Sequence, residues 1–247
     1  MLSLSTLDLL DLWEKGLARS PTEWALLLLA RAYPDMQMES LAGLCIGRRD
    51  ALLLSLRDQL FGPNLACITA CRSCGESLEL DFRCRDIMVM NGRDGADLSE
   101  PFSLTVDDFE VEFRLPNSLD LLAIDGNTEV SIARHILIER CLLNVSKEGR
   151  EVLADQLPPA VGNAISEYMS QLDPQADLQL EMKCPSCGQS WLEIFDIVSF
   201  FWKEISAWAQ RILRDVGKLA RFYGWSEKDI LRMSGYRRQI YLDMVDQ

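Results

Sequence analysis

Two cysteine motifs of nearly identical sequence lie far apart in the chain. The first reads CRSCG at 71–75 and the second CPSCG at 184–188, and each continues with one variable residue, a serine and a large apolar residue. A turn of this kind directs two thiolates toward one metal ion, and the glycine permits the tight backbone. Two such turns supply the four thiolates of a closed, tetrahedral zinc site. The sequence therefore predicts one structural zinc ion held by Cys71, Cys74, Cys184 and Cys187.

The 109 residues between Cys74 and Cys184 exceed the spacing of an ordinary zinc ribbon. The duplication nevertheless favours a shared site, because two hairpins that each carry one motif can pair with pseudo-symmetry, which makes 75–183 an insertion. Four thiolates leave no position for water or substrate, so metal-assisted catalysis is not expected. The alternative is two independent redox or unliganded turns, but a thioredoxin-like motif would begin a helix, whereas glycine and strand-like residues follow both motifs here.

The other four cysteines, Cys45, Cys67, Cys84 and Cys141, belong to no matching motif. Cys67 and Cys84 flank the first motif and are alternative ligands, although all four also suit the role of small buried apolar residues. His135, the only histidine, lies one helical turn before Glu139, so the two form either an acid–base pair or part of an ordinary helix surface. Phosphate-loop and nucleophile motifs are absent from the sequence, and we predict that the protein is not an enzyme.

The composition is that of a folded, acidic protein. The 247 residues are 48% hydrophobic and 26% charged, and 38 acidic against 25 basic residues give a net charge of −13. This charge repels the phosphate backbone and argues against a general nucleic-acid-coating role. The N-terminal segment does not read as a signal peptide, and the longest apolar runs are far shorter than the roughly 20 residues of a membrane span. We therefore expect a cytoplasmic protein with reduced cysteines.

The charge is unevenly distributed along the chain. Residues 201–247 hold nine basic and six acidic residues, a net charge of +3, whereas residues 1–200 carry −16. Seven acidic residues and no basic residue lie between Arg93 and Arg114: Asp94, Asp97, Glu100, Asp107, Asp108, Glu110 and Glu112. This acidic run is either a solvated face or a surface that meets a partner or the basic C-terminal region of the protein itself.

Hydrophobic periodicity and capping signals predict an α+β fold, mostly helical, with a small antiparallel β centre built around the split four-cysteine zinc ribbon. Helices are expected over most of 1–62, at about 127–144, after Pro158-Pro159, at 197–223, and after Ser226 and Ser234. Strands are expected at 65–71, 77–83, 102–106, 109–115, 178–184 and 190–195. We expect three regions: a helical region at 1–64, the β region at 65–195 with a helical insertion at about 117–175, and a long helix with two short helices at 196–247.

Aromatic residues are concentrated near the C-terminus. Trp202 and Trp208 are six residues apart in the predicted long helix, about 240° around its axis, so one compact core face cannot hold both. The cluster is either a core-facing stripe or an exposed docking surface, since aromatic residues and arginine are favoured at interface centres. The candidate partner-binding residues are Trp202, Trp208, Tyr223, Trp225, Arg237 and Arg238.

Several of these segments resemble a known family. The run GRRDALLLSLR at 47–57, the LFG turn at 60–62 and the first cysteine motif are similar to baseplate assembly proteins of contractile-tailed phages. CPSCG, FFWKEI at 200–205 and YGWSEKDILRMS at 223–234 resemble proteins encoded beside phage-tail-like contractile injection systems. The resemblance covers 47–84 and 184–245 well and 1–46 loosely, whereas 85–183 match no family we recognise.

The resemblance implies a non-enzymatic baseplate or hub assembly protein that acts through protein contacts in the cytoplasm of the producing cell, with the motif cysteines as zinc ligands. Baseplate or hub proteins of a contractile tail are the implied partners, with no small-molecule substrate, nucleic acid or membrane. The alternative from the residues themselves is a zinc-ribbon nucleic-acid-binding or transcription factor, for which the basic C-terminal region is available.

Overall fold

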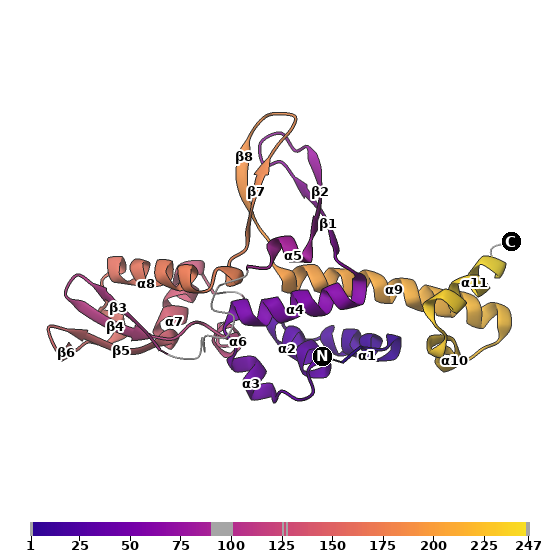
Figure 1. The fold of residues 1–247 in the computed structure, drawn as a ribbon, viewed down its shortest axis with the longest axis horizontal. Helices are drawn as coiled ribbons and strands as arrows, with labels where there is room; N and C mark the ends of the chain where they lie inside the picture. Colours follow the sequence, from indigo (N-terminus) through magenta and orange to yellow (C-terminus); the bar gives the residue numbers. More distant parts are fainter. Residues whose placement is uncertain (1, 90–100, 125, 127, 246–247) are drawn as a thin grey trace. The chain divides into compact units, whose positions relative to one another are not determined.

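The computed structural model describes residues 2–89, 101–124, 126 and 128–245 (Figure 1). The described chain divides into two compact units, of which unit 1 comprises residues 1–34 and 198–247 and unit 2 comprises residues 35–197. The chain ends therefore share one unit, whereas the sequence suggested consecutive regions with boundaries near 64 and 195. Among the described helices none is long and apolar enough to cross a membrane.

Unit 1 is built from helices. Its elements are α1 (Thr6–Gly16), α2 (Pro21–Ala32), α9 (Ile197–Tyr223, its first residue assigned to unit 2), α10 (Glu227–Arg232) and α11 (Gly235–Val245). The Ser20 hydroxyl accepts a hydrogen bond from the backbone N–H of Glu23, whose carboxylate accepts one from the N–H of Ser20, and this capping box starts α2. Residues spaced three or four apart on α9 face the core: Phe201, Ile205, Ala209, Ile212, Val216 and Leu219. The helix predicted at 197–223 is confirmed.

Unit 2 combines short helices with three antiparallel sheets. Its α-helices are α3 (Met38–Gly43), α4 (Ile46–Phe61), α5 (Cys84–Ile87), α6 (Ser118–Leu122), α7 (Val130–Cys141) and α8 (Pro159–Leu172), with 3-10 turns η1 (Ala154–Gln156) and η2 (Pro174–Ala176). The sheets are β1 (Asn64–Ala70) with β2 (Ser77–Arg83); β3 (Phe102–Val106), β4 (Phe109–Phe113), β5 (Leu142–Lys147) and β6 (Arg150–Glu151) in that order; and β7 (Gln179–Lys183) with β8 (Ser190–Ile194). The fold class is α+β, as predicted.

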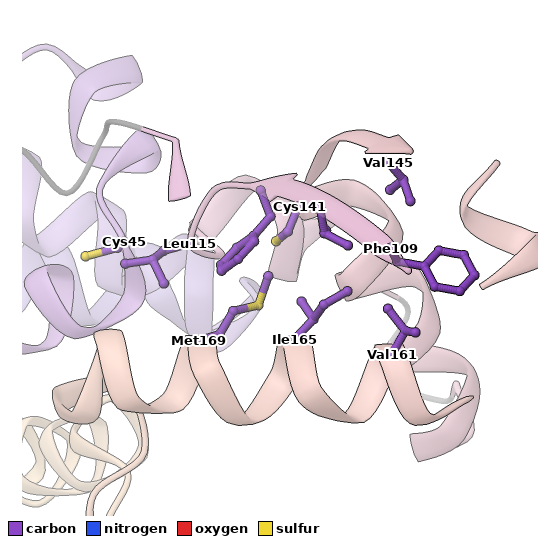
Figure 2. Packing of buried hydrophobic residues seen from close by; sticks show 10 residues of the cluster. Cys45, Phe109, Leu115, Cys141, Val145, Val161, Ile165 and Met169 are labelled. Atoms are coloured by element: carbon purple, nitrogen blue, oxygen red, sulfur yellow. The ribbon is translucent and has the colours of Figure 1, made fainter. Parts of the chain in front are cut away.

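The four-stranded sheet packs against α8. Alternate residues of β4, Val111 and Phe113, are buried in one cluster with Ile165 of α8. Figure 2 shows Ile165 and Val161 of the helix on the side that faces the sheet. Val145 of β5 lies opposite Val111 in the register and extends the same apolar layer. The core of this part of unit 2 is therefore a helix on one face of a sheet, and the other face of the sheet is polar.

The helix predicted at 127–144 is wrong at its C-terminal end. The α-helix ends at Cys141, and β5 begins at Leu142 and pairs with β4. The apolar run ILIERCLLNV suits a helix or a buried strand equally well, so periodicity alone could not place the boundary. The region expected to be a helical insertion therefore also contains two strands. Within the acidic run, Asp94, Asp97 and Glu100 lie outside the described residues.

Candidate metal centre

Each cysteine motif forms the turn of a separate two-stranded hairpin (Figure 1). In the first turn, the N–H of Cys71 donates to the carbonyl oxygen of Glu76 at 2.8 Å and the N–H of Gly75 donates to the carbonyl of Cys71 at 2.9 Å. The N–H groups of Cys184 and Gly188 make the same two bonds in the second turn, both at 2.9 Å. The two motifs thus fold as copies of one structure.

A glycine is required at the same place in both turns. Gly75 has a φ of 76° and Gly188 a φ of 75°, in the left-handed region that disfavours residues with a Cβ. This conformation turns the chain back directly after the second cysteine, so both sulfur atoms of a motif end on the same side of the turn. The sequence-based explanation for the glycines is confirmed.

The two turns bring all four cysteine sulfur atoms together. The Sγ atoms of Cys71 and Cys187 are 3.7 Å apart, those of Cys74 and Cys184 are 3.6 Å apart, and all four lie within 4.8 Å of one another. A disulfide would need about 2.05 Å. Sulfur atoms around zinc, with bonds of about 2.3 Å at tetrahedral angles, are about 3.8 Å apart. The cluster fits a single tetrahedral ion, and its all-sulfur donor set suits soft metals such as zinc.

The backbone and the neighbouring thiols shift the ionisation of the first motif. Hydrogen bonds from the backbone N–H groups of Cys74 and Ser73 lower the pKa of the Cys71 thiol to about 6. The N–H of Glu76 is the largest single influence on Cys74 and favours its thiolate. Hydrogen bonding with the thiols of Cys184, Cys187 and Cys71, together with desolvation, outweighs it and raises the pKa of Cys74 to about 12. Four sulfur atoms this close cannot all carry negative charge without a cation between them. The close approach of the four sulfur atoms is therefore compatible with a positive ion between them.

Alternate side chains on the two hairpins are half-buried and exposed. In the first hairpin, the half-buried set includes Leu78, Leu80 and Phe82, and in the second it includes Leu180 and Trp191. The rings of Phe82 and Phe195 meet edge-to-face, with centroids 5.7 Å apart, near the base of the hairpins. Apolar side chains thus join the two ribbons at the base, and the sulfur cluster joins them at the tips.

Helix α4 anchors the base of both hairpins. At its C-terminal end, buried Arg57 donates to the carbonyl oxygen of Gly62 at 2.7 Å and contacts the sulfur of Cys84 at 3.7 Å, and these two residues flank the first hairpin. At its N-terminal end, the N–H of Gly47 donates to the carboxylate of Asp173 at 2.8 Å, just before the turn that leads to the second hairpin. One helix therefore positions both halves of the cysteine cluster.

Sequence analysis missed the role of Gly47 and Asp173. A Cβ at Gly47 would lie 1.8 Å from Oδ1 of Asp173, so only glycine permits this contact. Burial raises the pKa of Asp173 despite the hydrogen bond from Gly47. Next along α4, Arg49 and Asp50 form a buried ion pair at 2.7 Å. The sequence did contain an indication of a special role for Gly47, since GRRD combines glycine with charged residues at the start of an apolar helix. It could not indicate Asp173 as the partner, because the position of Asp173 depends on the tertiary fold.

The comparisons with known proteins identify the family. The family model described as T4 bacteriophage base plate protein matches residues 23–202, nearly three quarters of the chain. The chain belongs to this family. The match includes α4 and all four cysteines of the cluster, and it confirms the predicted resemblance to phage baseplate proteins. Its extent differs from the prediction, because it includes residues 85–183, for which no resemblance was predicted, and ends at residue 202, before most of the predicted C-terminal resemblance. No curated protein and no solved structure matches the chain.

The remaining cysteines of this baseplate-family chain lie outside the cluster. Cys45, Cys84 and Cys141 are buried and Cys67 is half-buried. Burial raises the pKa of Cys45 to about 11 and that of Cys141 to about 12, so both stay protonated thiols at neutral pH. Among the described residues, the one group of at least three potential metal ligands consists of the four motif cysteines. The structure thus gives no support to Cys67 or Cys84 as ligands.

His135 lies exposed on α7. With Glu139 it lines a mainly apolar hollow of about 380 Å³ between α7 and the start of α8. Apolar residues such as Leu157 and Pro158 form the rest of its wall, together with a few polar groups. The position of His135 agrees with the interpretation of an ordinary helix-surface residue.

The candidate partner-binding residues are all in unit 1 and differ in exposure. Trp202 is half-buried and meets the ring of Trp24 with centroids 5.0 Å apart. Trp208, Tyr223 and Trp225 are half-buried beside the core cluster that includes Leu219 and Ile230. Arg237 is exposed, whereas Arg238 is buried, with 6% of its surface accessible. These aromatic residues contribute to packing within unit 1, and their role in partner binding stays a prediction.

Proposed function

We propose that this baseplate-family chain is a zinc-stabilised, non-enzymatic assembly protein of a contractile phage tail or a related contractile injection system. It acts by contacts with baseplate or hub proteins in the cytoplasm of the producing cell. The observation that carries this proposal is the cluster of four cysteine sulfur atoms contributed by two duplicated turns within the family match.

The chemistry of the cluster supports a structural ion. Zinc held by Cys71, Cys74, Cys184 and Cys187 would balance the charge of the thiolates and cross-link the two hairpins. Groups of the protein itself support the thiolates. The N–H of Ser73 lies 3.4 Å from the sulfur of Cys71, and the turns that contain Gly75 and Gly188 hold the sulfur atoms together. A shell of four sulfur ligands leaves no site for a substrate, which supports a role in assembly rather than in catalysis.

Metal analysis tests the first half of the proposal. Protein purified without added metal is expected to contain one zinc ion per chain by elemental mass spectrometry, and Cys74→Ser is expected to contain none. Cys67→Ser is the matched control and should retain the ion. Iron in place of zinc, or metal-free protein that folds and melts as the wild type does, would contradict a structural zinc site.

Particle assembly tests the second half. When the gene is disrupted in the producing cell, electron microscopy is expected to show tails without complete baseplates, and the wild-type gene should restore them. Complementation by Cys67→Ser but not by Cys74→Ser would connect assembly to the cluster. Separating finished particles from free protein then distinguishes a permanent component from an assembly chaperone. Normal particles in the disrupted strain would overturn the assembly role.

A further inference from the structure

Helix α9 carries a stripe of basic side chains on the face opposite its buried stripe. Two residues after each of the core-facing positions of α9 comes a side chain about 200° around the helix, on the opposite face. These six positions are Lys203, Ala207, Arg211, Arg214, Lys218 and Arg221, and all are exposed. Five of the six are basic and none is acidic. We call these five side chains the basic stripe, which extends about 27 Å along the helix.

Neighbouring side chains of the basic stripe carry the same charge and repel one another, and Asp215, four residues after Arg211, offsets part of this repulsion. Arg211, Arg214, Lys218 and Arg221 follow one another at spacings of three or four residues, where like charges cost about 0.2–0.5 kcal/mol per pair. An ordinary solvent-facing helix alternates acidic and basic residues, which removes this cost. Leu213 and Phe222, 37% and 61% exposed, flank the stripe. Basic side chains beside exposed apolar ones are the composition of a docking surface for an acidic partner.

The chain itself contains a strongly acidic region. Unit 1 holds 12 basic and 10 acidic residues, a net charge of +2, whereas unit 2 holds 13 basic and 28 acidic residues, a net charge of −15. A molecule divided in this way attracts other copies of itself when the basic face of one meets an acidic face of the next.

The polar face of the β3–β4–β5–β6 sheet is acidic. Side chains on this face form two rows across the strands, Ser103–Glu112–Asn144 and Thr105–Glu110–Ser146–Glu151. Among the described residues of these strands, the face carries three acidic side chains and no basic one, and Glu110 and Glu151 are exposed. We call Glu110, Glu112 and Glu151 the acidic face. It belongs to the region of the acidic run noted in the sequence.

We propose that the basic stripe of one molecule binds the acidic face of a second copy of this chain. The lengths of the two surfaces are similar. Arg211, Arg214 and Lys218 extend over about 10 Å of helix, and the row Thr105–Glu110–Ser146–Glu151 spans about 14 Å across the sheet. The contact joins two different surfaces, so the association is head-to-tail. It is independent of the metal centre and goes beyond the proposed assembly function.

Charge favours a protein partner over a nucleic acid for the basic stripe. The net charge of −13 opposes any acidic partner, but a duplex carries one negative charge per about 1.7 Å of its length. It is therefore repelled more strongly than the acidic face, which carries three carboxylates. A contact between one helix face and a small sheet is below the roughly 800 Å² that each partner buries in a standard interface. We therefore expect a weak association that is sensitive to salt.

Charge reversal on each surface tests the proposal in the full-length, metal-loaded protein. Light scattering at about 100 µM protein is expected to give a mass above the 28.0 kDa of one chain in about 50 mM salt, and the single-chain mass in about 500 mM salt. Arg211→Glu/Arg214→Glu/Lys218→Glu should associate at least about tenfold more weakly, and so should Glu110→Lys/Glu112→Lys/Glu151→Lys. An equimolar mixture of the two reversed variants should associate again, because each reversed surface then meets an opposite charge.

The matched control is Lys15→Glu/Lys228→Glu/Arg232→Glu, which changes the net charge equally at exposed positions outside the stripe and should associate like the wild type. Circular dichroism and melting curves check folding. If the triple variant of the basic stripe does not fold, the single variant Arg214→Glu replaces it, and if the triple variant of the acidic face does not fold, the single variant Glu110→Lys replaces it. A wild type that stays a single chain in low salt, a control that loses association equally, or a mixture that stays monomeric would overturn the proposal. Stripe-dependent binding of a duplex of about 20 base pairs without self-association would assign the stripe to nucleic acid instead.

Discussion

The sulfur atoms of Cys74 and Cys184 lie 3.6 Å apart although the two residues are 110 positions apart in the chain. With a metal ion bound as proposed, this proximity would make the cysteine cluster a cross-link between two distant hairpins of unit 2. Helix α4 supports the same arrangement from below, through Arg57 at one end and Gly47 at the other. The consequences for stability can be tested separately at the tips and at the base of the hairpins.

At the tips, Cys184→Ser is expected to remove the metal and destabilise the fold. Losing a cross-link that closes a loop of about 100 residues costs on the order of 4 kcal/mol in chain entropy, and the lost binding free energy of the ion can make the total larger. Thermal unfolding together with metal analysis measures both effects. Cys67→Ser, in the same hairpin pair but outside the cluster, should change stability by less than about 1 kcal/mol. A Cys184→Ser protein that keeps its ion and its melting temperature would exclude Cys184 as a ligand.

At the base, Gly47→Ala is expected to lower the free energy of unfolding by about 2–4 kcal/mol. The new Cβ would lie 1.8 Å from Oδ1 of Asp173, so the carboxylate must move and its hydrogen bond to the N–H of residue 47 is lost. Gly43→Ala is the control, because no atom lies within 4 Å of its Cβ position and alanine favours the helix. Denaturant unfolding of the two variants compares them directly. Equal stability of both would show that Asp173 adapts without cost.

Asp120 is expected to make stability depend on acid pH. Its buried carboxylate accepts hydrogen bonds from Arg114 at 2.6 Å and from Arg140 at 3.1 Å. Burial alone would raise its pKa, but these bonds and the N–H of Asn117 keep the pKa below the ordinary value. A lowered folded-state pKa gives stability that is present above the unfolded value of about 4 and is lost as the pH falls through the folded value.

Asp120→Asn should therefore cost about 2 kcal/mol at pH 7, allowing for the partial exposure of both arginines. The difference from the wild type should remain constant down to about pH 5 and shrink below about pH 4. Unfolding curves between pH 7 and pH 3 measure it, with exposed Asp108→Asn as the control. A difference that grows as the pH falls would have the wrong sign for a stabilising carboxylate.

Trp225→Ala is expected to destabilise unit 1. The indole stacks on Tyr223, with ring centroids 4.3 Å apart, and meets Tyr241 edge-to-face at 4.8 Å. Removing a half-buried ring with these contacts should cost about 2 kcal/mol. Tyr236→Ala, at a position 81% exposed, should be neutral within about 0.5 kcal/mol. A normal melting temperature for Trp225→Ala would leave partner binding as the main role of this side chain.

The sequence was most informative where local chemistry alone decides the structure. The extent of α9 follows from one continuous apolar stripe, and both cysteine turns follow from their glycines. The strand β5 was missed because Leu142 and its neighbours suit either a helix or a strand, and pairing with β4 decides between them. The grouping of residues 1–34 with 198–247 and the contact between Gly47 and Asp173 depend on the tertiary fold, which local patterns do not contain.

The distance in sequence between the two cysteine turns also fixes when all four cysteines become available during synthesis of the chain. When the first turn leaves the ribosome it offers only two sulfur atoms, and the other two follow after more than a hundred further residues have been synthesised. Ion capture by all four ligands can then occur only when most of the family region, residues 23–202, has been made. If the cluster holds a metal ion as proposed, a product truncated before Cys184 would lack two of the four ligands and could not form the closed site.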